Sequence, residues 1–127
     1  MELMSNLLEC QRMLEKLRTD FPLPKTLTLR SEFHPGPVLR GVGRKPLLGR
    51  ACQILPTLPI QQATIHVAIG VPLPVCLDTV AHEYYHVIQI QVLRAKPDHK
   101  VNGPFEKAAI EFAVNYTKEY MTSRCLM

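Results

Sequence analysis

Tryptophan is absent from the 127-residue sequence, and all aromatic residues together contribute only 6% of it. The four cysteines form no Cys-x-x-Cys pair, which argues against a cysteine-based zinc site. The N-terminal segment carries charges throughout and lacks the apolar core of a secretory signal. We therefore expect a cytoplasmic protein whose cysteines stay reduced and pack as small apolar residues.

Residues 51–77 contain no charged side chain, which is a pattern that membrane segments share. Four prolines interrupt this stretch, namely Pro56, Pro59, Pro72 and Pro74. Proline breaks an α-helix, whereas a spanning helix needs about 20 consecutive apolar residues. The stretch therefore predicts buried strands joined by turns, and we expect no membrane contact.

Apolar residues make up 46% of the sequence and charged residues 20%, which excludes intrinsic disorder and coiled coils. A chain of this length predicts a single domain over residues 1–127. The net charge of +4 is concentrated in residues 25–50, where Glu32 is the only acid. An exposed basic loop accounts for this segment, and so does a surface for an acidic partner such as nucleic acid. The basic residues are Lys25, Arg30, Arg40, Arg44, Lys45 and Arg50.

Hydrophobic periodicity predicts three helices and three short strands in the order helix, three strands, helix, helix. The helices cover residues 2–20, 75–94 and 104–122, the strands cover 26–33, 48–55 and 63–69, and residues 34–46 form a loop rich in glycine and proline. This order predicts an α+β fold in which the helices pack on one face of a small three-stranded sheet.

The strongest chemical signal is the HExxH motif His82-Glu83-Tyr84-Tyr85-His86. On a helix, residues four apart lie about 40° apart around the axis, so both imidazoles can reach one metal ion. Glu83 can act there as a general base toward water. The apolar residues of the same helix fall on its opposite side, so we expect the histidines to face a cleft.

A catalytic zinc ion needs a third protein ligand and one open position. His99, Glu106 and Glu111 follow the motif closely enough to supply it. Helical spacing puts Glu106 on the same side of the last helix as Ile110 and the small Ala113, whereas Glu111 shares its side with lysines. We therefore expect Glu106 to be the third ligand, with His99 in the preceding loop as the alternative.

Two stretches of the sequence resemble a known enzyme family. Residues 79–88, TVAHEYYHVI, resemble the extended zinc-peptidase signature, and residues 104–113, PFEKAAIEFA, are similar to the second-helix motif of gluzincins. The element order resembles small zincin-like domains of the ImmA/IrrE type, which cut phage or stress-response repressors. The resemblance implies a zincin-like fold, zinc bound by His82, His86 and Glu106, and Glu83 as the base.

The chain departs from many gluzincins at two positions of the second motif. Ile110 stands where an aspartate or asparagine often supports the ligands, and Ala108 stands where related motifs carry a second glutamate. Metal-ligating histidines need a partner for their second ring nitrogen. We expect His66 or Tyr116 to take over this supporting role.

These patterns predict a zinc-dependent peptidase that acts on a protein or peptide substrate. We expect the substrate to lie extended along the strand over residues 63–69 and to pair with it by strand addition. A non-catalytic zinc-binding module for regulation or protein interaction on the same fold is the alternative. A third interpretation is a nucleic-acid-associated protease or binder that uses the basic segment over residues 25–50.

Overall fold

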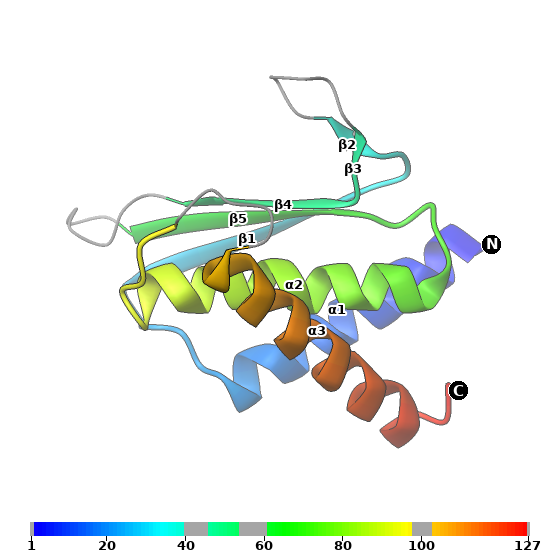
Figure 1. Cartoon of the computed structure of the whole chain (residues 1–127). Helices are drawn as coiled ribbons and strands as arrows, with labels where there is room; N and C mark the ends of the chain where they lie inside the picture. The colour runs from blue at the N-terminus through cyan, green and yellow to red at the C-terminus, as the bar shows by residue number, and fades with distance from the viewer. Residues whose placement is uncertain (1, 40–45, 54–60, 98–102, 127) are drawn as a thin grey trace.

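The computed structural model describes residues 2–39, 46–53, 61–97 and 103–126. It is an α+β structure in which a small mixed sheet covers three helices (Figure 1). The helices are α1 (Glu2–Asp20), α2 (Leu73–Gln91) and α3 (Pro104–Ser123). The strands are β1 (Leu27–His34), β2 (Val38–Leu39), β3 (Pro46–Leu47), β4 (Gly49–Gln53) and β5 (Gln61–Ala68). The predicted α+β class, the helices and the three-stranded sheet are confirmed.

The three-stranded sheet has β5 at its centre, parallel to β1 on one side and antiparallel to β4 on the other. Side chains alternate between the two faces of a strand. On β5, the alternation buries Ile65 and Val67 in the core and leaves Thr64 and His66 on the opposite, outer face. The register places Arg50 of β4 beside His66 on this outer face.

The central position of β5 contradicts the expected substrate pairing along residues 63–69. Over this stretch the backbone of β5 is already bonded to β1 and β4, so no further strand can add to it. The sequence pattern identifies a strand but not its neighbours, which depend on long-range pairing. Within the described residues, β4 is the strand of this sheet beside α2 that has an unpaired edge.

The sequence predicts that residues 34–46 form a loop, but the structure contains short strands in this segment. Val38–Leu39 and Pro46–Leu47 pair as the antiparallel strands β2 and β3. Two-residue strands are too short to show the alternation on which a strand prediction rests. Pro46 lacks a backbone donor, which is tolerated because, among the described residues, this ladder has two strands and each is an edge strand.

Helix α2 is the central helix and packs against α1, α3, β4 and β5. Its buried stripe at helical spacing includes Leu77, Val80, Tyr84 and Val87, all of them fully buried. Helix α1 contributes Cys10, Met13 and Leu17 to the same core, and burial raises the pKa of the Cys10 thiol. Among the described helices, none has the length and apolarity that crossing a membrane requires.

Candidate metal centre

The two motif histidines, His82 and His86, lie one turn apart on α2 and converge on one point. Their Nε2 atoms are 3.1 Å apart, and their rings meet edge to face with centroids 4.7 Å apart. The side chains retain 17% and 13% of their exposure, so they are shielded but reachable. This follows from the helical spacing, because the apolar stripe of α2 occupies the opposite side.

Glu106 reaches the same point from the first turn of α3. Its Oε1 lies 2.6 Å from His82 Nε2, and its Oε2 lies 3.2 Å from His86 Nε2. The fully buried Ala113 stands on the side of α3 that packs toward the core. Ile110, expected on that side, is 47% exposed, so the buried stripe of α3 is narrower than the sequence indicates.

The three side chains can together hold a metal ion. One ligand atom from each of His82, His86 and Glu106 lies within 4.8 Å of the others. For metal–nitrogen bonds of about 2.0–2.1 Å, neighbouring ligands of a tetrahedral ion are about 3.3 Å apart, close to the 3.1 and 3.2 Å separations at His86 Nε2. The 2.6 Å between Glu106 Oε1 and His82 Nε2 is the length of a short hydrogen bond. Without a cation, these converging acceptors must share protons, and a bound metal ion satisfies all of them at once.

Gln89 holds the ring of His86 in its ligating orientation. The Gln89 side-chain amide donates to the carbonyl of Phe105 at 2.9 Å, and its Oε1 lies 2.9 Å from His86 Nδ1. His86 Nδ1 therefore donates to Gln89, which makes Nε2 the ring nitrogen whose lone pair can bind a metal. The Phe105 ring stacks on the His86 ring at 5.0 Å. Gln89 is buried and lies three residues after His86, a spacing that places both on one side of a helix.

The supporting roles expected for His66 and Tyr116 are wrong. His66 lies on the outer face of the sheet, with its Nδ1 3.1 Å from His34 Nε2. The Tyr116 hydroxyl donates to Asp20 at 2.7 Å, which ties α3 to the end of α1. Neither position could be excluded from local spacing, because both depend on how distant elements pack.

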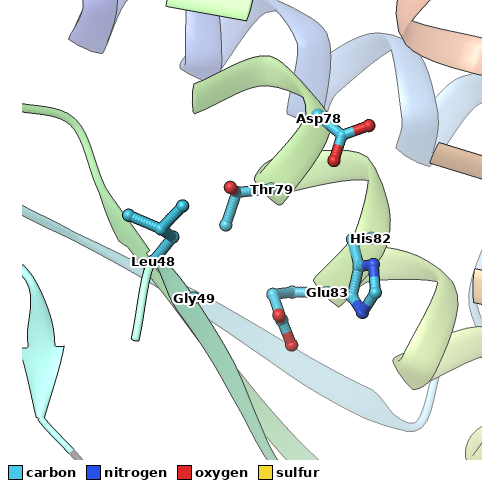
Figure 2. Close-up of a pocket in the computed structure, with 6 residues that line it drawn as sticks. All are labelled: Leu48, Gly49, Asp78, Thr79, His82 and Glu83. Atoms are coloured by element: carbon cyan, nitrogen blue, oxygen red, sulfur yellow. The ribbon is translucent and has the colours of Figure 1, made fainter. Parts of the chain in front are cut away.

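Glu83 lies in a pocket between α2 and β4 (Figure 2). The pocket has a volume of about 170 Å³ and is lined by Leu48, Gly49, Asp78, Thr79, His82 and Glu83. Figure 2 shows that Glu83 and His82 project from neighbouring positions of α2, with Gly49 on the strand that faces them. Glu83 is only 8% exposed, so its carboxylate is covered by β4 while it borders a cavity beside a possible metal ligand.

The buried position changes the acidity of Glu83. Burial, helped by the nearby charge of Glu106, raises the pKa of Glu83 to about 8. Burial also raises the pKa of Asp78, an effect that the charge of His82 partly offsets. A carboxyl group with a pKa near neutrality in a cleft is typical of a group that takes and returns protons.

The raised pKa predicts that Glu83 lowers the free energy of unfolding of the metal-free protein in a pH-dependent way. Between about pH 4.5 and 8, the folded state holds a proton on Glu83 that the unfolded chain has lost. The free energy of unfolding therefore falls as pH rises through this window. Glutamine does not titrate, so we expect the free energy of unfolding of the Glu83→Gln variant, relative to that of wild type, to rise by on the order of 1–4 kcal/mol between pH 5 and pH 8.

Urea unfolding of both proteins with a chelator present measures this difference at each pH. Glu111→Gln is the matched control, because Glu111 is exposed on α3 and its replacement should leave the pH dependence of wild type unchanged. A Glu83→Gln advantage that is equal at pH 5 and pH 8 contradicts the assignment of the shifted proton to Glu83.

Gly49 sets the distance between β4 and α2 at this pocket. A Cβ atom at Gly49 would overlap the methyl group of Thr79 and lie 3.0 Å from Cγ and Oε2 of Glu83. We expect Gly49→Ala to lower the free energy of unfolding by about 1–3 kcal/mol through overpacking. Gly36→Ala is the control, because a Cβ there meets nothing within 4 Å and should change stability by about 0.5 kcal/mol or less. Chemical denaturation compares the variants, and equal stabilities would contradict this tight contact.

The remaining candidate residues lie apart from the cluster or outside the described residues. Glu111 is exposed and lines a separate groove with Phe21 and Tyr85. His99 lies outside the described residues, and so do Arg40, Arg44 and Lys45 of the basic segment. The described basic residues of that segment, Lys25, Arg30 and Arg50, are all exposed.

Comparisons with known proteins return no relative. A scan against protein-family models gave no match, and searches of curated proteins and of solved structures gave none either.

Proposed function

We propose that the protein is a zinc-dependent peptidase in which His82, His86 and Glu106 hold the zinc ion and Glu83 is the general base. The observation that carries this proposal is the buried Glu83 carboxyl at the wall of a pocket beside a convergent His–His–Glu cluster. A metal cluster alone can also serve a structural purpose. The burial of the ionisable Glu83 carboxyl beside the cluster, however, costs folding free energy that a structural metal site does not require. Its placement favours catalysis.

The donor set of the cluster fits zinc. Two imidazole nitrogens and one carboxylate are among the ligand sets of catalytic zinc sites, which keep a fourth position open. Structural zinc sites are instead closed by four protein ligands, commonly including cysteine thiolates. Of the described cysteines, none belongs to the cluster. The resemblance of the two helical motifs to gluzincins supports the same assignment.

A zinc ion at this site would supply Lewis acidity, which acidifies water and polarises the carbonyl of a peptide bond. Glu83 would accept the proton of the attacking water on its carboxylate and pass it to the leaving amine. Gln89 would keep the His86 ring oriented throughout, because its own amide is fixed by the carbonyl of Phe105. The cover of β4 over Glu83 would limit the access of bulk water.

The unpaired edge of β4 is the place where a substrate would lie. A peptide in extended conformation can add there as a further strand and use main-chain hydrogen bonds that do not depend on its sequence. Gly49 begins this strand and faces Glu83, so a scissile bond near Gly49 would be close to the base. This replaces the central strand β5 as the expected docking strand.

The experiment that tests the proposal is hydrolysis of a peptide library by zinc-loaded protein, with fragments identified by mass spectrometry. Wild-type protein should produce fragments, chelated wild-type protein should produce none, and the Glu83→Gln variant should produce them at a strongly reduced rate. The main alternative is a non-catalytic metal-binding module. Zinc-loaded wild type that binds metal stoichiometrically yet cleaves no peptide or unfolded protein would favour that alternative and contradict peptidase activity.

A further inference from the structure

The helices cover one face of the sheet (Figure 1), and three side chains with metal-binding atoms gather on the other face. Glu32 and His34 come from β1 and His66 comes from β5. The parallel register places Glu32 directly opposite His66. His34 follows two residues further along β1, opposite Ala68. Residues two apart on a strand share a face, so all three side chains project from the same side of the sheet.

The two imidazole nitrogens of this cluster are as close as those of the HExxH pair. His34 Nε2 and His66 Nδ1 are 3.1 Å apart, the same separation as between the Nε2 atoms of His82 and His86. One ligand atom from each of the three side chains lies within 4.8 Å of the others. Both imidazoles are half-buried, and their rings stack at 5.3 Å.

The backbone holds the Cα atoms of these three residues in place without a metal. The pairing of β1 with β5 fixes the Cα position of Glu32, and the pairing of β5 with both β1 and β4 fixes that of His66. The last residue of β1 is also fixed, because the N–H of Ile69 donates to the carbonyl of His34 at 2.8 Å. Because the backbone is already ordered, an ion that binds here costs only the conformational entropy of the side chains.

We propose that Glu32, His34 and His66 form a second metal-binding site, which takes a divalent transition-metal ion such as Zn²⁺. Two of the three donors are imidazole nitrogens, which favour zinc, copper, nickel or cobalt over the oxygen-preferring Mg²⁺ and Ca²⁺. The 3.1 Å between His34 Nε2 and His66 Nδ1 matches two ligands of a single ion with bonds of about 2.0–2.1 Å. The exposed Glu32 side chain, with one oxygen within 4.8 Å of both nitrogens, can close on the same ion. The ion would bind β1 to β5 across the outer face.

The charge of the neighbourhood makes Glu32 an essential part of this site. Arg50 on β4 lies beside His66 on the same face, and Arg30 precedes Glu32 by two residues on β1. Both guanidinium groups oppose the arrival of a cation. Glu32 is the carboxylate that offsets them, so its neutral variant Glu32→Gln should lose the metal although both histidines remain.

A hydrogen bond between His34 and His66 accounts for the short nitrogen–nitrogen distance without any metal. It does not involve the Glu32 carboxylate, one oxygen of which lies within 4.8 Å of both nitrogens. It also predicts that the histidine pair is indifferent to added zinc. The two interpretations are therefore separated by metal binding at this face alone.

The experiment uses the full chain with the helix-side cluster removed by His82→Ala and His86→Ala, so that zinc on the outer face is counted separately. Equilibrium dialysis with metal quantification should give two zinc ions per chain in wild type and one in this background. Adding His66→Ala or Glu32→Gln to the background should lower the affinity for zinc by more than the roughly 10–100-fold that loss of a merely supporting group costs. Thr64→Ala is the matched control, since Thr64 lies on the same face of β5 but outside the cluster.

Thermal unfolding supplies a second readout that does not depend on catalysis. Zinc should raise the melting temperature of the His82→Ala, His86→Ala background and of its Thr64→Ala derivative, because an ion that binds only the folded state stabilises it. The His66→Ala derivative should melt at one temperature with and without zinc. A background that binds no zinc, or a His66→Ala derivative that binds it unchanged, overturns the proposal. Neither result bears on the helix-side cluster, which the converse variant with His34→Ala and His66→Ala tests.

Discussion

The Glu83→Gln variant is expected to bind zinc as wild type does and to hydrolyse peptides about 10²–10⁴-fold more slowly, the usual contribution of a general base. Glutamine has nearly the same shape and leaves His82, His86 and Glu106 untouched, so the metal cluster stays intact. Its amide cannot accept the proton of the attacking water. Rates with a fluorogenic peptide chosen from the library cleavage sites measure the loss, and zinc content is measured on the same samples.

The burial of Glu83 makes this comparison informative. Because the carboxyl is covered by β4 and only 8% exposed, solvent cannot replace it as a proton acceptor as readily as at an open surface. Glu111→Gln removes a carboxylate from the exposed side of α3 and should retain the wild-type rate. Full hydrolysis by Glu83→Gln with its zinc in place would show that another group accepts the proton.

The helix-based part of the site could be predicted from the sequence because helical geometry is local. Positions 82 and 86 face one point on any helix that includes both, and the side of α3 that carries Glu106 follows from a period of 3.6 residues. The structure brings all three side chains together as this reasoning expects. The burial of Glu83 cannot be predicted from local spacing, because it depends on β4. Gly49 of β4, which lies against Glu83, precedes it by more than 30 residues in the chain.

The sheet-based features could not be predicted, because they depend on strand order and register. Alternation along residues 63–69 shows that His66 points away from Ile65 and Val67, but not that its neighbour is His34. The parallel pairing of β1 with β5 decides this, and a shift of one residue would turn His34 to the other face. The same limit explains why the sequence pattern assigns substrate binding to β5, which is the central strand of the sheet.

The third ligand provides the other large expected effect. Glu106→Ala should remove one zinc equivalent per chain and with it peptide hydrolysis, since it leaves His82 and His86 as the only described ligands. Both oxygens of Glu106 are engaged, at 2.6 Å from His82 Nε2 and 3.2 Å from His86 Nε2. Loss of such a ligand should weaken zinc by about 10²-fold or more, beyond what the loss of a supporting partner costs. Competition with a chromogenic chelator measures the affinity.

Two further variants decide whether Glu106 acts as a ligand or merely accepts hydrogen bonds from the histidines. Glu111→Ala changes a carboxylate on the same helix that lines a separate groove, so zinc affinity should match wild type. His99→Ala removes the alternative ligand and should also leave affinity unchanged. If His99→Ala loses the zinc equivalent while Glu106→Ala keeps it, the ion is held by three histidines, and the carboxylate of Glu106 serves only to orient two of them.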